Sequence, residues 1–137
     1  MIIRAYTDSN LLPASKAVKE LGRYLYKNID SAYDQTSSGN MYDIYMTVYY
    51  QVPEYMQVPW MDEQYNDLQE MNILLNLTTY QNKIRINILV NDENEKTLGY
   101  YLLSPETLHD IEKAKSTILK IVKKRLNKEF EDYEFIF

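Results

Sequence analysis

The chain has 137 residues, of which 45% are apolar, and a formal net charge of −5 at pH 7. This length and composition predict a single folded domain over residues 1–137 and exclude an intrinsically disordered chain. Cysteine is absent, which excludes a disulfide framework, a thiol nucleophile and a thiolate-ligated metal site.

No apolar run approaches the roughly 18 residues that a membrane-spanning helix needs, and the N-terminus lacks the pattern of a signal peptide. Asn, Lys, Ile and Tyr, which all have AT-rich codons, make up 48 of the 137 residues and favour a low-GC bacterium, phage or plasmid as the source. We therefore expect a soluble protein in the cytoplasm of a bacterial host cell, without a membrane partner.

The first elements expected along the chain are a short strand over residues 2–7 and a helix over residues 12–28. Apolar residues in the second segment recur at the spacing of one helix face, with cations on the opposite face. Gly22 lies in the middle of this helix, where it costs up to about 1 kcal/mol relative to Ala, so we expect it to allow close approach to a sheet. Residues 35–40 are polar and predict a loop.

Strict alternation of apolar and polar residues over 41–52 predicts a strand with one core face. Pro53 and Pro59 bracket a stretch that cannot be a central strand, so residues 54–67 are predicted to form a long loop. A hairpin with its turn near Gln81 and Asn82 follows, and then a strand over 98–103. Because these four strands follow one another without an intervening helix, an antiparallel meander is expected.

Ser104 followed by Pro105 predicts the start of a second helix, which extends to about Lys128. A last strand over 132–137 is expected to point Tyr133, Phe135 and Phe137 inward. The order β-α-β-β-β-β-α-β indicates an α+β fold, with two amphipathic helices packed on one face of a mainly antiparallel sheet. The predicted core includes Ile44, Val48, Ile73, Leu75, Ile86, Ile88, Ile118 and Val122.

No catalytic, cofactor-binding or metal site is predicted. His109 is the only histidine, and the pair Glu106 and His109 supplies too few ligands for a metal site. With three glycines, the chain has neither a phosphate-binding loop nor a dinucleotide fingerprint. The cations at the end of the second helix complement the helix dipole and are followed by four acidic residues, so direct binding of nucleic acid is not expected. We expect that the protein is not an enzyme.

Residues 28–82 contain eight acidic side chains and no Lys or Arg, together with eight of the 14 Tyr, five of the six Met and the only Trp. An acidic, aromatic and Met-rich surface is typical of a recognition face for a basic partner. The residues expected to bind the partner are Asp43, Tyr45, Tyr49, Glu54, Tyr55, Trp60, Asp62, Glu63, Tyr65 and Asp67.

The leading hypothesis is a small acidic protein-interaction module that docks onto a basic surface, such as the nucleic-acid site of an enzyme. In a phage or mobile element this would suit an inhibitor of a host defence enzyme, for example an anti-CRISPR or anti-restriction protein. The alternatives are a small α+β enzyme or ligand-binding domain, a homo-oligomeric accessory protein of a mobile element that associates through Tyr45, Tyr49 and the loop over residues 54–67, and an acidic surface that is merely solvated.

Overall fold

The structure is a computed structural model that describes residues 14–29, 33–38, 41–52, 68–92 and 95–137. Its elements in chain order are α1 (Ala14–Asn28), β1 (Tyr33–Ser38), β2 (Met41–Gln51), β3 (Gln69–Tyr80), β4 (Lys83–Val90), β5 (Lys96–Leu103), the 3-10 helix η3 (Pro105–Asp110), α2 (Ile111–Glu129) and β6 (Glu134–Ile136).

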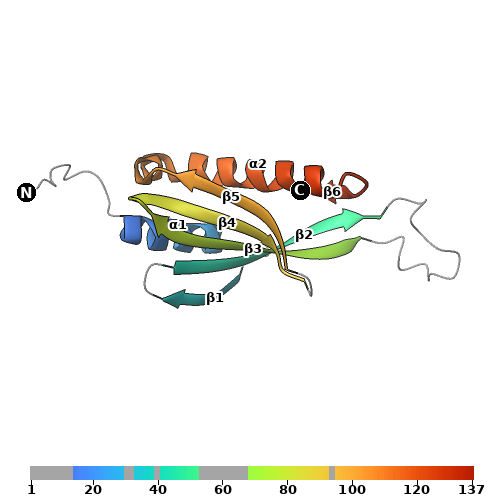
Figure 1. Ribbon diagram of the computed structural model, residues 1–137, viewed down its shortest axis with the longest axis horizontal. Helices are drawn as coiled ribbons and strands as arrows, with labels where there is room; N and C mark the ends of the chain where they lie inside the picture. The colour runs from blue at the N-terminus through green and yellow to red at the C-terminus, as the bar shows by residue number, and fades with distance from the viewer. Residues whose placement is uncertain (1–13, 30–32, 39–40, 53–67, 93–94) are drawn as a thin grey trace, which may run out of the picture.

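Five strands form a curled antiparallel sheet in the order β1-β2-β3-β4-β5 (Figure 1). The short strand β6 also pairs with β2, and because β3 occupies one edge of β2, β1 and β6 share the other edge. Helix α1 contacts β2, β3 and β4, and α2 contacts β5. The predicted α+β fold, with two helices on one face of an antiparallel sheet, is confirmed.

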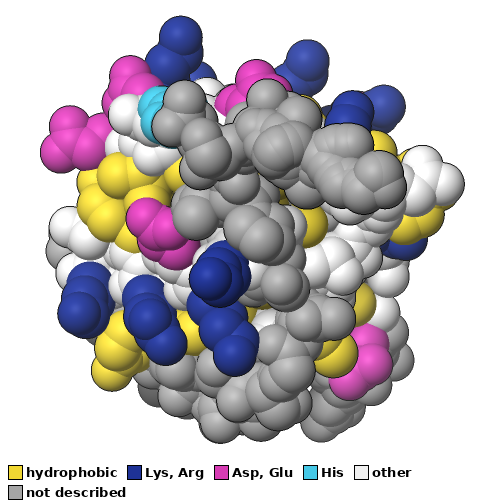
Figure 2. All heavy atoms as spheres, turned by 90° about the vertical axis from the view of Figure 1, so that its left-hand side faces the viewer, with side chains coloured by type: hydrophobic (Ala, Val, Ile, Leu, Met, Phe, Trp, Pro, Cys, Tyr) yellow, Lys and Arg dark blue, Asp and Glu magenta, His cyan; other side chains and the backbone are white. Residues whose placement is uncertain are grey.

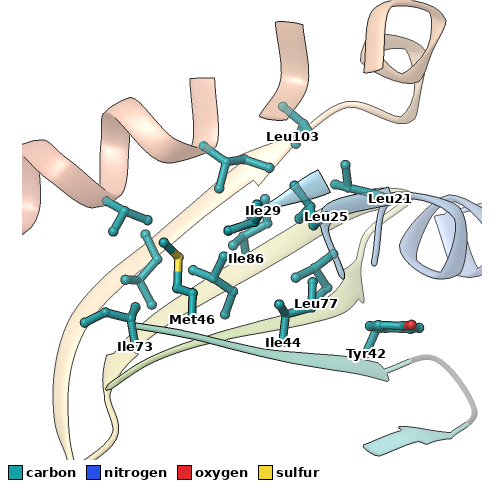
Figure 3. Packing of buried hydrophobic residues seen from close by; sticks show 14 of the residues in the cluster. Leu21, Leu25, Ile29, Tyr42, Ile44, Met46, Ile73, Leu77, Ile86 and Leu103 are labelled. Carbon is teal, nitrogen blue, oxygen red and sulfur yellow. The ribbon is translucent and has the colours of Figure 1, made fainter. Parts of the chain in front are cut away.

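The core lies between this face and the helices. In Figure 3, Leu21 and Leu25 of α1 point into the same space as Ile44, Leu77 and Ile86 of the sheet. All eight predicted core residues are buried, and the described residues include no buried polar or charged side chain. The alternation of apolar and polar residues therefore gave the correct face of each central strand.

Two local features set the register of the meander. Gln81 and Asn82 have φ values of 46° and 64°, which matches the two-residue hairpin turn whose twist suits the flanking strands. The β4–β5 pairing is irregular between Ile88 and Leu89, and opposite this point Gly99 has a φ of 105°. Arg125 of α2 donates from Nη2 to the Tyr100 carbonyl oxygen at 2.8 Å, which ties α2 to this part of β5.

The prediction of a polar loop over residues 35–40 is wrong for residues 35–38, because Tyr33–Ser38 forms strand β1. Backbone hydrogen bonds to the edge of β2 order this stretch, although its side chains lack the pattern of a strand. The strand predicted over residues 2–7, the first residues of the first predicted helix and the whole loop predicted over residues 54–67 lie outside the described ranges.

The helix predicted to begin at Pro105 is divided. Ser104 caps η3 by accepting from the Glu106 amide at 3.4 Å, and Asp110 caps α2 by accepting from the Lys113 amide at 3.3 Å. The second cap explains the division, since Asp110 competes with a continuous helix for the same amide. In the described part of the chain, no helix is long and apolar enough to cross a membrane.

The last strand is shorter than predicted, and Phe137 is 55% exposed, so the prediction that it points inward is wrong. Tyr133 and Phe135 are partly buried as expected. They belong to an aromatic cluster in which the Tyr50 and Tyr133 rings stack with their centroids 4.7 Å apart. Phe130, Tyr133 and Phe135 hold the end of the chain against β2, and Phe137 extends the cluster at its exposed end, with its ring centroid 5.7 Å from that of Phe135.

Candidate functional site

The sheet face opposite the helices, called here the outer sheet face, is formed by the side chains that alternate with the buried ones. These side chains are half-buried or exposed, and none of the described helices packs on them. On the central strands they include Asp43, Tyr45, Thr47, Tyr49, Asn72, Leu74, Asn76, Thr78, Arg85, Asn87, Leu89, Tyr100 and Leu102.

A row of polar side chains crosses the outer sheet face. Asp43, Asn76, Asn87 and Tyr100 are direct cross-strand neighbours on β2, β3, β4 and β5. Arg85 Nε donates to the Asn87 amide oxygen at 3.1 Å, and Asn87 Nδ2 donates to the Asn76 amide oxygen at 3.0 Å. Asn76 Nδ2 in turn donates to Asp43 Oδ1. The amides of Asn87 and Asn76 thus each accept a hydrogen bond from the direction of Arg85 and donate one in the direction of Asp43. In such a chain, neighbouring hydrogen bonds strengthen one another.

Arg85 at the cationic end of this polar row also contacts two tyrosines. Its guanidinium carbon lies 4.3 Å from the ring centroid of Tyr100 and 5.7 Å from that of Tyr80, both within the range of cation–π attraction. Tyr100 is 52% exposed and Tyr80 is 43% exposed. The guanidinium therefore holds two aromatic rings at the surface near the β3–β4 turn.

A second row on the same face is largely apolar. Tyr45 pairs with Leu74, and Leu74 pairs with Leu89. All three side chains are half-buried, and Tyr49, four residues after Tyr45 along β2, is 37% exposed. An apolar strip beside a polar row is the composition of a protein-binding surface, where aromatic and aliphatic contacts supply area and polar groups fix the register.

Three of the ten residues predicted from the sequence to bind a partner lie on the outer sheet face: Asp43, Tyr45 and Tyr49. The other seven lie outside the described residues: Glu54, Tyr55, Trp60, Asp62, Glu63, Tyr65 and Asp67. Tyr50 pairs with Gln69, so β2 ends and β3 begins side by side, close to Tyr49. The segment between those strands is therefore anchored at the Tyr49 end of the outer sheet face.

Sequence reasoning missed the contributions of β4 and β5. Arg85 shares the face with Asp43, although the sequence around Asp43 contains no cation. One contact of the polar row could have been predicted from the sequence, because a two-residue turn at Gln81 and Asn82 places Asn76 opposite Asn87. The pairing of Asp43 with Asn76 could not have been predicted in the same way, because no short turn joins β2 to β3 and fixes their register.

Charge is divided between the helices and the rest of the chain. The segments α1 and α2 contain 11 of the 15 Lys and Arg residues and three of the 20 Asp and Glu residues. The remainder of the chain therefore contains 17 acids and four cations. Figure 2 shows several Lys and Arg side chains gathered side by side on one end of the molecule. Because both helices cover one face of the sheet, this division in sequence places most of the cations on the helix side.

Among the described residues, Tyr50 and Tyr24 have raised pKa values. Burial, with a smaller contribution from the neighbouring Tyr133 hydroxyl, raises the pKa of Tyr50. Desolvation raises the pKa of Tyr24, and the carboxylates of Glu112 and Asp110 raise it further. Both effects follow from helix and strand packing, and neither tyrosine belongs to the outer sheet face.

The single histidine lies at a surface hollow of about 290 Å³ beside η3 and the start of α2. Glu106, His109 and Asp110 line this hollow, and His109 is exposed. Within the described ranges, no three or more His, Asp or Glu side chains are grouped so that they could hold a metal ion. The described residues of the outer sheet face offer hydrogen bonds and aromatic contacts.

Comparisons of this chain with known protein families, with curated proteins and with solved structures find no match.

Proposed function

We propose that this protein is an interaction module that binds a basic surface of a partner protein. The contacts would come from the outer sheet face and from the acidic segment that joins β2 to β3. The observation that carries this proposal is the division of charge: the helix segments hold 11 of the 15 cations, so the chain outside them is acidic, and no described helix covers the outer sheet face. Such a surface attracts a basic partner and opposes an acidic one.

The chemistry of the outer sheet face supports a protein partner. Tyr49 and Tyr100 are exposed aromatic side chains at different parts of this face, and tyrosine is one of the residues that most often dominates binding energy. The hydrogen bonds from Arg85 to Asp43 fix the side chains between them before a partner arrives. Prior ordering lowers the entropy lost on binding.

The partner class that fits best is a protein with a nucleic-acid site. Carboxylates spaced along a strand and its following segment can take the place of phosphates, and tyrosines can take the place of stacked bases. An inhibitor of a host defence nuclease, carried by a phage or another mobile element, is the form of this function that we propose.

The test is capture of partners from a nuclease-treated lysate of a low-GC bacterium on immobilised protein, with elution by increasing salt. The variants Tyr49→Ala and Tyr100→Ala are compared with Tyr26→Ala, which removes a tyrosine of similar exposure from α1. We expect each outer-face variant to weaken binding of the captured protein by about tenfold or more, as loss of an aromatic anchor does, and Tyr26→Ala to leave it unchanged.

Charge reversal provides a second measurement on the isolated complex. Asp62→Lys combined with Glu63→Lys should slow association and flatten its dependence on salt, because these acids lie in the segment free of cations. If the captured protein binds all of these variants as it binds the parent, the acidic surface is only solvated and the proposed function is wrong.

A further inference from the structure

An open pocket of about 540 Å³ lies between α2, the end of α1 and the edge of β2. Its position follows from the strand pairing. Strand β1 pairs with this edge of β2 as far as Tyr45, and β6 pairs with it from Tyr49 onward. No described strand pairs with residues 46–48 on this edge, and the same three residues line the pocket.

The floor of the pocket is hydrocarbon and belongs to the core. Ile29, Met46, Val48 and Val122 line it, and each of them is at most 8% exposed. Ile136 and Phe137 also line it, and they are 51% and 55% exposed. Two exposed apolar side chains thus lie next to an apolar floor. Removal of this apolar surface from water by a ligand would be favourable.

Three lysines of α2 line the same pocket: Lys115, Lys120 and Lys123. Lys115 Nζ donates to the carbonyl oxygen of Asn28 at 3.2 Å, so α1 and α2 hold this ammonium group in place. Lys123 Nζ lies 5.1 Å from the ring centroid of Phe137, which brings a positive charge directly to the apolar wall. None of the described residues that line the pocket is Asp or Glu.

We propose that this pocket binds an anionic amphiphile, a fatty acid whose carboxylate meets the lysines and whose chain lies on the apolar floor. The volume is within the range of small-molecule pockets, roughly 300–1,000 Å³. The described lining contains four residues with uncharged polar side chains, which are Asn28, Thr47, Tyr49 and Ser116, and two of them, Thr47 and Tyr49, alternate with the core-facing residues of β2. Four uncharged polar side chains are few for binding a sugar or a nucleotide, but a ligand with a single charged end needs no more.

The test is calorimetric titration with dodecanoate below its micelle concentration, with dodecan-1-ol as the uncharged probe of equal chain length. We expect saturable binding of dodecanoate and binding of dodecan-1-ol that is weaker by about tenfold or more, because the alcohol does not engage the lysines. Methyl signals of Met46 and Ile136 should shift in the nuclear magnetic resonance spectrum during the titration.

Matched variants of α2 separate the pocket from the general charge of the helix. Lys120→Gln with Lys123→Gln should weaken dodecanoate binding by about tenfold. Lys124→Gln with Lys128→Gln removes the same charge from exposed positions of the same helix that do not line the pocket, and should change binding by less than about twofold. Ser116→Phe places a ring at the exposed margin of the pocket and should abolish binding, with the fold checked by circular dichroism.

Four outcomes would overturn the proposal: no saturable binding of dodecanoate, equal binding of the alcohol, equal effects of the two double lysine variants, or methyl shifts confined to residues outside the pocket. A concentration-dependent dimer in sedimentation that disappears in Ser116→Phe would also overturn it, since the occupant would then be a second copy of this chain. The variants that test the pocket all lie on α2 and change no residue of the outer sheet face, so their failure is distinguishable from failure of the proposed function, although Thr47 and Tyr49 border both surfaces.

Discussion

Gly22 of α1 lies directly against the ring of Tyr42 in β2. A Cβ atom added at Gly22 would lie 2.4 Å from Cγ of Tyr42 and 2.5 Å from Cδ1, closer than carbon atoms approach one another in folded proteins. Both residues are buried, so the ring has little free space to enter. The absence of a side chain at position 22 therefore sets how closely α1 approaches the sheet.

Gly22→Ala should destabilise the protein, although Ala is the better helix former. The gain in helix propensity is about 1 kcal/mol, whereas forcing a methyl group into a packed core costs about 1–3 kcal/mol and sometimes more. We expect the free energy of unfolding, measured by urea denaturation, to fall by about 1–2 kcal/mol. Tyr42→Leu in the same background should recover part of this loss, whereas Tyr42→Phe should not, since the contacting atoms belong to the ring. A stabilised Gly22→Ala variant would show that α1 can move away from β2 without cost.

Asn76→Ala should remove two hydrogen bonds of the polar row at once, those to Asp43 and to Asn87. Each such bond contributes about 0.5–1.5 kcal/mol, and one to a carboxylate contributes more. We expect the free energy of unfolding to fall by about 1–3 kcal/mol.

Asn87→Ala, measured alone and together with Asn76→Ala, supplies the control for this prediction. Because the two amides bond to each other, the double variant should lose less stability than the sum of the single variants. Strict additivity would mean that the polar row does not act as a connected network in solution.

Ile86→Ala tests the register of the hairpin between β3 and β4. Ile86 is 1% exposed and pairs with Leu77 on the core face, so its truncation should cost about 2–5 kcal/mol. Thr78→Ala on the outer sheet face should cost less than about 1 kcal/mol, because this side chain is only half-buried. A loss below about 1 kcal/mol for Ile86→Ala would contradict this register, since a slip of one residue moves the side chain to the other face.

The parts of the fold that the sequence predicted are those where one face of an element is buried. The alternation around Ile44 and Ile86 and the helical spacing around Leu21 and Ile118 each select one face, and all four side chains are buried. Strand β1 carries no such alternation, because backbone pairing with β2 forms it. Phe137 is apolar and is nevertheless exposed, since Tyr133 and Phe135 before it occupy the space next to Tyr50.

The candidate site was less predictable for a different reason. Binding surfaces combine side chains from strands that are distant in sequence, and Asp43 meets Arg85 only through Asn76 and Asn87. The lysine-lined pocket likewise requires Lys115 and Lys123 of α2 to lie next to Met46 of β2. Neither arrangement has a local pattern, because each depends on strand order and on the position of α2 over the sheet.

The raised pKa of Tyr50 predicts how the free energy of unfolding changes at alkaline pH. Burial, followed by the neighbouring Tyr133 hydroxyl, raises the pKa of Tyr50 in the folded protein above its ordinary value of 10.0. The folded state therefore retains a proton that the unfolded state begins to lose near pH 10. The stabilisation from this proton is complete below pH 10 and is lost as the pH rises through the folded-state pKa.

We therefore expect the free energy of unfolding to decrease above about pH 10 and Tyr50→Phe to make that decrease less steep, because phenylalanine has no proton to lose. Urea denaturation at several pH values between 8 and 11, with tyrosinate absorbance followed in parallel, measures both quantities. Tyr50→Phe preserves the ring that stacks on Tyr133, so its stability near neutral pH should remain close to that of the parent. If the parent and Tyr50→Phe lose stability with the same slope above pH 10, the Tyr50 hydroxyl is hydrated in solution, and the packing of β6 and the aromatic cluster against β2 is looser than the structure describes.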